Sequence, residues 1–254
     1  MLIAFDIGNT NIVGGVFAGS DLKYEFRLKT DAGRTVDEYR ALIQPLLDRA
    51  LETGYRIDRA IIASVVPPVT PSIVRVAQEC FGLEPLQVGP GVKTGLSIKT
   101  TDPAAVGADR VVNAVAAKEL YGLPALIIDF GTATSFDYVD EQSNYQGGII
   151  APGLISASDA LVRNTAKLPK IELVWPKSVV GKSTVTAMQA GTVVGYLCLV
   201  EGLVARVVSE VGPIRHIIAT GGLGRLMAEH SQVIQVYDGN LTLRGLEILA
   251  RMNA

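Results

Sequence analysis

The sequence predicts an α/β protein made of two similarly built halves, each with helices flanking a mixed sheet that opens with a three-stranded meander. Three observations support this fold class. Apolar runs of strand length alternate with amphipathic segments, the order of elements is the same in both halves, and a strand ending in Asp-x-Gly occurs once in each half. We expect the domains to comprise residues 1–115 and 116–254.

The first half begins with strands and continues with alternating helices and strands. Its strand-like runs, separated by turn residues, are Leu2–Phe5, Ile12–Phe17, Tyr24–Leu28, Ala60–Val66 and Leu86–Val88. Thr35 and Glu38 have the spacing of a capping box, which predicts a helix of about 18 residues ending near Gly54. A shorter helix, Ser72–Phe81, should end at Gly82.

The second half repeats that opening. Its expected strands are Ala125–Ile128, Ser135–Val139, Tyr145–Ile150, His216–Ala219 and Val233–Val236. Its expected helices run from Leu154 to about Thr165, from Thr184 to Val211, and from Leu241 onward.

Composition restricts the possible partners and the compartment. With 48% hydrophobic residues and a net charge of −2, neither nucleic acid nor an anionic membrane is an expected partner. Cys80 and Cys198 fit no metal or redox spacing and are expected to be buried free thiols, which favours a reducing cytoplasm. We expect no signal peptide, and we expect Ala190–Val200, shorter than a membrane span, to form a buried helix.

The repeated Asp-x-Gly sequences have the composition of phosphate-binding loops. Gly8 and Gly131 allow close approach of backbone, and the hydroxyl and amide residues after them can donate to phosphate oxygens. Asp6 and Asp129, at strand ends, would each meet a cation. The alternative is that each Asp caps its own turn.

Two other glycine motifs resemble nucleotide sites in part. Gly181-Lys182-Ser183 lacks the first glycine of a Walker loop, because that position holds Pro176. Gly221 and Gly222 follow a strand and could let backbone approach a flat ligand such as adenine, or could form a simple tight turn.

A further motif, Gly107-Ala108-Asp109-Arg110, places a carboxylate beside a guanidinium near a helix start. Asp109 could accept the proton of an attacking hydroxyl while Arg110 binds an anionic or polar group of the substrate. An ordinary surface ion pair is the alternative.

Taken together, four motifs in order resemble those of type III pantothenate kinases: Asp6–Asn11, Gly107–Arg110, Asp129–Thr134 and Gly147–Gly153. The resemblance implies two ribonuclease-H-like domains of the actin-like ATPase type, a homodimer, and ATP-dependent phosphorylation of the terminal hydroxyl of pantothenate. That reaction is the first step of coenzyme A biosynthesis. The resemblance also implies magnesium and a monovalent cation, potassium or ammonium.

Roles for individual residues follow from the same resemblance. Asp6 would lie near magnesium within the first phosphate loop, which comprises Asp6, Ile7, Gly8, Asn9, Thr10, Asn11, Ile12 and Val13. Thr132 would make the second phosphate contact, and Asp129 would bind the monovalent cation. Asp109 would be the catalytic base within the pantothenate segment, which comprises Gly107, Ala108, Asp109 and Arg110.

Two threonines complete the expected substrate site. Thr184 would contact substrate at the dimer interface, and Thr100 stands where the family often has Tyr, a departure that bears on how substrate packs there. Gly191 and Gly195, four residues apart, permit close helix packing, either across a dimer or within the chain.

Other functions remain alternatives at this level. An actin-fold kinase for another hydroxylated small molecule, such as a sugar, would share the phosphate loops. A non-catalytic nucleotide-sensing regulator would have lost the base or a cation ligand, whereas Asp6, Asp109 and Asp129 are all present. A filament subunit of the actin type is disfavoured by the short chain.

Overall fold

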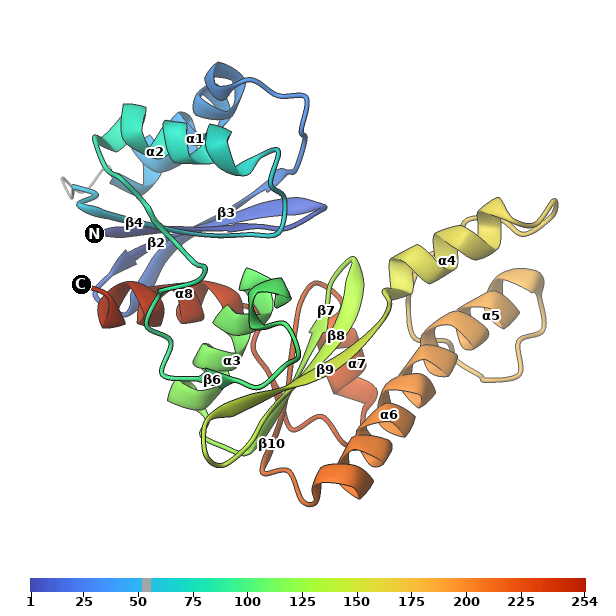
Figure 1. The fold of residues 1–254 in the computed structure, drawn as a ribbon. Coiled ribbons are helices and arrows are strands. Elements are labelled where there is room, and N and C mark those ends of the chain that lie inside the picture. Colours follow the sequence, from blue (N-terminus) through green and yellow to red (C-terminus); the bar gives the residue numbers. More distant parts are fainter. Residues whose placement is uncertain (52–55) are drawn as a thin grey trace. The chain divides into compact units, whose positions relative to one another are not determined.

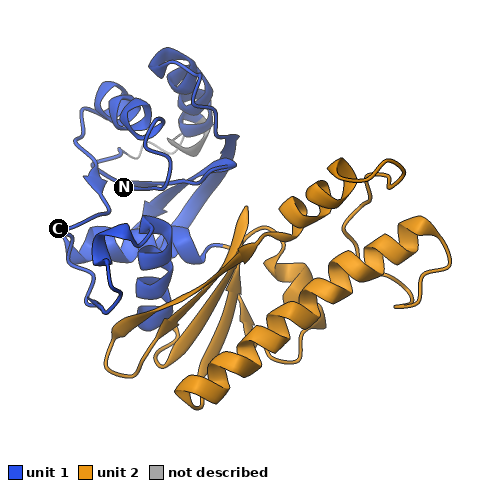
Figure 2. Cartoon of the chain, turned by 45° about the vertical axis from the view of Figure 1, so that its right-hand side comes forward, with its two compact units in different colours: residues 1–120, 240–254 blue, residues 121–239 orange. Residues whose placement is uncertain are grey.

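The computed structural model describes residues 1–51 and 56–254. The chain forms two compact units: residues 1–120 together with 240–254, and residues 121–239 (Figure 2). Each unit contains a mixed sheet with helices, so the α/β class is confirmed.

The sheet of unit 1 has the strand order β3-β2-β1-β4-β5. Its strands are β1 (Leu2–Ile7), β2 (Asn11–Ala18), β3 (Asp21–Lys29), β4 (Arg59–Ser64) and β5 (Leu86–Gln87). The first three pair antiparallel and confirm the meander, whereas β4 pairs parallel to both β1 and β5. A parallel neighbour requires a crossover connection, which α1 provides.

Helices cover both faces of this sheet (Figure 1). One face packs on α1 (Val36–Leu51) and α2 (Thr70–Phe81), the other on α3 (Ala108–Leu120) and α8 (Leu241–Met252). Because successive side chains of a strand point to opposite faces, Ile3, Phe5 and Ile7 face the first pair of helices while Leu2 and Ala4 face the second. Burial on both sides explains why β1 is an almost continuous apolar run. The short elements β6 (Ser97–Ile98) and η1 (Pro103–Ala105) precede α3.

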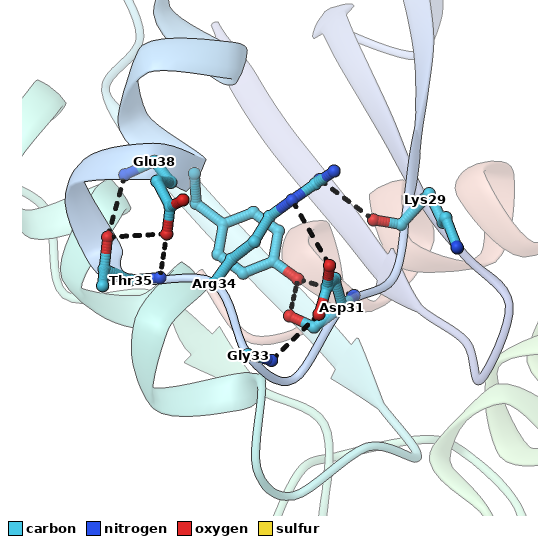
Figure 3. Close-up of polar contacts among 7 residues, drawn as sticks. Lys29, Asp31, Gly33, Arg34, Thr35 and Glu38 are labelled. Carbon is cyan, nitrogen blue, oxygen red and sulfur yellow. Dashed lines mark hydrogen bonds and ion pairs between the residues drawn. The ribbon is translucent and has the colours of Figure 1, made fainter.

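The capping box at the start of α1 is confirmed. Glu38 Oε2 accepts a hydrogen bond from the Thr35 backbone amide at 2.7 Å, and the Glu38 amide donates to Thr35 Oγ1 at 3.3 Å (Figure 3). The hydrogen bond from the Thr35 backbone is the main reason that the pKa of Glu38 is lowered. Pro45 lies inside α1, and the predicted end near Gly54 lies outside the described residues.

Unit 2 has the same arrangement of strands, in the order β9-β8-β7-β10-β11. These strands are β7 (Ala125–Phe130), β8 (Ala133–Val139), β9 (Asn144–Pro152), β10 (His216–Thr220) and β11 (Val236–Tyr237). The first three form the second predicted meander, and β10 pairs parallel to β7. The strand predicted at Val233–Val236 begins only at its last residue, because the Val233 and Ile234 amides donate to Ser231 Oγ instead of to a strand.

The long helix predicted from Thr184 to Val211 is present but is not the buried helix expected. It consists of α5 (Thr184–Gln189), a π-helical turn (Ala190–Val194) and α6 (Gly195–Val211), and it packs beside α4 (Leu154–Arg163) and α7 (Gly224–His230). Its 28 residues are long and apolar enough to cross a membrane by length and composition, and 28% of its most apolar window is buried. Cys198 lies on its exposed side, so the expectation that both thiols are buried is wrong. Cys80 is half-buried, and both cysteines are free.

The C-terminal helix α8 returns to unit 1, whereas the expected division gave residues 116–254 to one domain. Leu243, Leu246 and Leu249 of α8 are buried against α3 and the sheet of unit 1, which accounts for this placement. At the crossing of the two helices, a Cβ on Gly245 would lie 2.4 Å from the Val112 carbonyl oxygen.

Gly245→Ala should therefore destabilise unit 1. Although Ala has the higher helix propensity, the overlap with Val112 forces α8 away from α3, and we expect the free energy of unfolding to fall by about 1–3 kcal/mol. Denaturant unfolding measures this change. Gly89→Ala, at a glycine with no neighbour within 4 Å of the added carbon, is the control and should change the value by less than ~0.5 kcal/mol. Equal effects of the two substitutions would contradict the packing argument.

Candidate functional site

The first glycine loop is a tight connection between β1 and β2. The Gly8 amide donates to the Asn11 carbonyl at 3.0 Å, and Thr30, just after β3, holds the loop with Oγ1 donating to the Gly8 carbonyl at 2.6 Å. Asn9 and Thr10 are exposed at its tip, and Asp6 is half-buried one residue before the end of β1. The loop is thus fixed at its base and open at its tip.

The Gly107–Arg110 segment lies beside this loop in unit 1. Val65, immediately after β4, donates its backbone amide to the Ile7 carbonyl at 3.0 Å, and its Cγ1 lies 3.5 Å from the position of a Cβ on Gly107. Val65 therefore links the end of β1 to the start of α3, although these two places are far apart in the sequence.

Asp109 occupies the first turn of α3. One of its carboxylate oxygens accepts a hydrogen bond from the Arg110 backbone amide at 2.8 Å, and both residues are half-buried. A carboxylate at a helix N-terminus is stabilised in its ionised form by the peptide dipoles. Nearby in the sequence, Thr100 Oγ1 is buried and has no hydrogen-bond partner among the described residues.

The second glycine loop, in unit 2, repeats the geometry of the first. The strands β1 and β7 have the same pattern of burial, with Asp6 and Asp129 at the same half-buried position. The Gly131 amide donates to the Ala133 carbonyl at 3.1 Å, and Thr132 is exposed at the tip.

Two residues that follow β9, Gly153 and Ser156, contact the backbone of the second loop. A Cβ on Gly153 would lie 2.4 Å from the Thr132 carbonyl oxygen and 2.6 Å from that of Gly131, so only glycine permits this approach. Ser156, in the first turns of α4, donates from Oγ to the Thr132 carbonyl at 2.9 Å.

The turn after β10 brings Gly221 against Asp129. Gly221 has φ of 85°, and a Cβ there would lie 2.6 Å from Asp129 Oδ1 and 2.7 Å from the Phe130 carbonyl oxygen. Two oxygen atoms therefore converge on a space that a side chain would fill. Gly222, the next residue, is exposed.

Thr184 lies at the start of α5, on an apolar groove of about 780 Å³ within unit 2. The groove runs between α4 and the long helix, and its lining includes Leu161, Gly191, Gly195 and Leu199. The preceding Ser183 is the N-cap of α5, with Oγ accepting from the Thr186 amide.

The carboxylates of the site suit a nucleotide-borne divalent cation better than a metal held by protein alone. Within residues 1–51 and 56–254, no three His, Cys, Asp or Glu side chains gather as a metal site. Magnesium at nucleotide sites takes one or two protein carboxylates and completes its shell with phosphates and water, so the single carboxylate Asp6 fits it.

The structure thus brings the predicted site residues together in two groups, one in each unit. Unit 1 gathers the loop from Asp6 to Val13 and the segment from Gly107 to Arg110, and unit 2 gathers Asp129, Thr132 and Gly221. Sequence reasoning missed the supporting residues Val65, Ser156 and Thr30. Each acts through a partner far away in sequence, and no local pattern marks it.

Several solved structures share the fold of this chain over nearly its whole length. It is 18% identical to a conserved Baf family transcriptional activator from Campylobacter jejuni, with a TM-score of 0.63 over 99% of this chain and 98% of that one. It is 13% identical to the activator of 2-hydroxyisocaproyl-CoA dehydratase from Clostridium difficile with bound ADPNP (TM-score 0.54, 99% and 93% covered). It is also 13% identical to the ethanolamine utilization protein EutJ from Carboxydothermus hydrogenoformans (TM-score 0.57, 97% and 89% covered). These likenesses agree with two ribonuclease-H-like domains.

The family of the chain is shown by its sequence. A sequence model of type III pantothenate kinases matches residues 2–206, which include both glycine loops and the Gly107–Arg110 segment. The chain therefore belongs to the type III pantothenate kinases, and it is an enzyme that phosphorylates pantothenate with ATP in the first step of coenzyme A biosynthesis.

Proposed function

We propose that Asp109 is the general base of this phosphorylation and that the two glycine loops bind the phosphates of ATP. The observation that carries the proposal is the link through Val65, which holds the first loop and the Gly107–Arg110 segment side by side in unit 1. Phosphoryl transfer needs an acceptor hydroxyl aligned with the terminal phosphate and charge stabilisation around it, rather than a covalent intermediate.

In this proposal Asp109 receives the proton of the pantothenate hydroxyl as that oxygen attacks phosphorus. Its position in the first turn of α3 favours the ionised form that a base requires. Arg110, Gly107 and Ala108 contact the substrate, and the buried Thr100 hydroxyl offers it a hydrogen bond. The role of the base depends on placement more than on basicity, since proton transfer can be late in a loose transition state.

Each glycine loop is proposed to contact the phosphates of ATP. Asn9 and Thr10, exposed within the first loop (Asp6 to Val13), and Thr132, exposed in the second, would supply donors to phosphate oxygens. Gly221 and Gly222 would let backbone approach the adenosine. Magnesium bound with ATP would be held by Asp6 and would neutralise charge on the transferred phosphoryl group.

Asp109→Asn tests the base. The substitution keeps size and the hydrogen bond from Arg110 but removes the negative charge, so kcat should fall about 10²–10⁴-fold while the affinity for ATP changes little. Steady-state kinetics and nucleotide titration measure the two effects.

Asp102→Asn provides a matched control for that experiment. Asp102 caps η1 through the Ala104 amide, a role that Asn also fills, so kcat should stay near that of the unmodified enzyme. If Asp109→Asn kept near-native turnover while Asp6→Asn abolished it, the base would have to be sought elsewhere.

We further propose that a monovalent cation binds at Asp129. The oxygens of Asp129 and Phe130 converge beside Gly221, and oxygen atoms are the ligands that such an ion prefers. Asp129→Asn would weaken this site without altering its shape.

The measurement is the rate in buffers that contain only one monovalent cation. Activity should require potassium or ammonium, and Asp129→Asn should abolish the difference between potassium and sodium. Equal rates of the unmodified enzyme in sodium-only and potassium buffers would leave Asp129 as a turn-stabilising residue.

We also propose that the apolar groove is covered by a second copy of the chain, as the family resemblance leads one to expect. Leu161 and Leu199, which line the groove, are each 40% exposed, and nothing lies within 4 Å of a Cβ on Gly191 or Gly195, so a neighbouring helix can approach closely. Thr184, on the same groove, would then lie at the interface near the partner's substrate.

Leu199→Glu tests this arrangement. A charge in the covered groove should convert a dimer to monomer in sedimentation velocity and lower the turnover, because the shared site is lost. Val211→Glu, at an exposed apolar residue of the same helix outside the groove lining, should leave both unchanged. A fully active monomer would overturn the shared site.

A further inference from the structure

A tyrosine of the long helix reaches the base of the second glycine loop. Tyr196 is the second residue of α6, directly after the π-helical segment, and its hydroxyl oxygen is 2.7 Å from Thr134 Oγ1 and 2.8 Å from the Pro152 carbonyl oxygen. Thr134 is fully buried and Tyr196 nearly so. π-helical turns inside α-helices occur frequently at functional sites, where they re-aim a side chain.

The distribution of hydrogens in this contact follows from chemistry. A phenol carries one hydrogen and a carbonyl oxygen can only accept, so Tyr196 donates to Pro152 and the Thr134 hydroxyl supplies the second hydrogen bond. Burial raises the pKa of Tyr196, and the hydrogen bond with Thr134 opposes that shift without cancelling it. The hydroxyl therefore stays protonated at neutral pH, and the arrangement persists.

The two partners of Tyr196 stand on either side of the loop. Thr134 is the second residue of β8 and the last residue of the Gly131–Thr134 segment, while Pro152 ends β9. The two strands are paired at this point, Ala133 opposite Pro152. Pro152 also precedes Gly153, whose Cα packs against the Gly131 and Thr132 carbonyls.

We propose that Tyr196 is a positioning residue for ATP, which holds the second glycine loop in the shape that binds phosphate. Its hydroxyl holds Thr134, in the strand that follows the loop, and Pro152. Pro152 precedes Gly153, whose backbone packs against the loop. Ser156 fixes the Thr132 carbonyl from another helix, so the loop backbone is held from two directions and its amides are preorganised. This inference rests on the proposal that the second loop binds phosphate.

Tyr196→Phe removes the hydroxyl and keeps the ring. We expect the KM for ATP to rise about 3- to 10-fold, as loss of a buried, hydrogen-bonded hydroxyl implies, together with a fall in kcat, while the KM for pantothenate stays within about 2-fold. A merely structural role would lower the thermal stability but would leave the KM for ATP unchanged.

Tyr145→Phe is the matched control. Tyr145 is equally buried in unit 2, and its hydroxyl donates to Asp137 Oδ1 at 2.5 Å, between β9 and β8 and away from the glycine loop. The Tyr145→Phe enzyme should have a lower thermal stability and an unchanged KM for ATP. An equal rise in the KM for ATP in both variants would overturn the inference, because the effect would then reflect general loosening of unit 2.

Two further variants separate the inference from its premise. Thr132→Ala should raise the KM for ATP if the loop binds phosphate; no change would overturn the phosphate assignment and the inference together. A rise with Thr132→Ala but none with Tyr196→Phe would overturn the inference alone. If Tyr196→Phe does not fold, Thr134→Val removes one of the two hydrogen bonds of the Tyr196 hydroxyl from the loop side and should also raise the KM for ATP; an unchanged value would refute the role of Tyr196.

Discussion

Parallel pairing of the central strand is the constraint on which each half of the site depends. β1 pairs with β4 so that Ile7 lies opposite Ser64, and β7 pairs with β10 so that Asp129 lies opposite Thr220. In a parallel pair the carboxyl ends meet at one edge of the sheet, so the residues that follow each strand become neighbours. Val65 therefore reaches the first loop, and Gly221 reaches Asp129. A slip of one residue in either pairing would turn the Asp to the other face and separate these contacts.

The groove and the second loop share a residue. The Tyr196 ring lines the groove while its hydroxyl contacts Thr134 and Pro152. One side chain thus contributes to the apolar groove and also hydrogen-bonds the base of the second loop, as an amphipathic tyrosine can. Any protein that covers the groove would pack against the support of the loop.

Local patterns predicted the strands and loops well, and long-range contacts explain what they did not predict. The meanders follow from alternation and turn residues, and the repeated Asp-x-Gly placed Asp6 and Asp129 at equivalent positions. Only the start of α3 was foreseen, because its residues 111–117 are buried all round and give no amphipathic stripe.

Exposure of the long helix could not be predicted from apolar composition, since a covered surface and a buried core have the same residues. Cys198 was misplaced for the same reason. Support of the second loop by Tyr196 and Ser156 depends on residues 62 and 24 positions away from their partners, and no sequence spacing encodes such a distance.

The return of α8 to unit 1 has a consequence for the order in which the molecule can form during synthesis. Residues 121–239 form a continuous segment with its own core, so unit 2 has all its strands and helices before α8 has been made. Until α8 is made, the core between α3 and the sheet of unit 1 lacks Leu243, Leu246 and Leu249. On the ribosome, unit 1 is therefore begun first and completed last. Until α8 is made, the apolar surface that α8 will cover stays exposed and can bind chaperones.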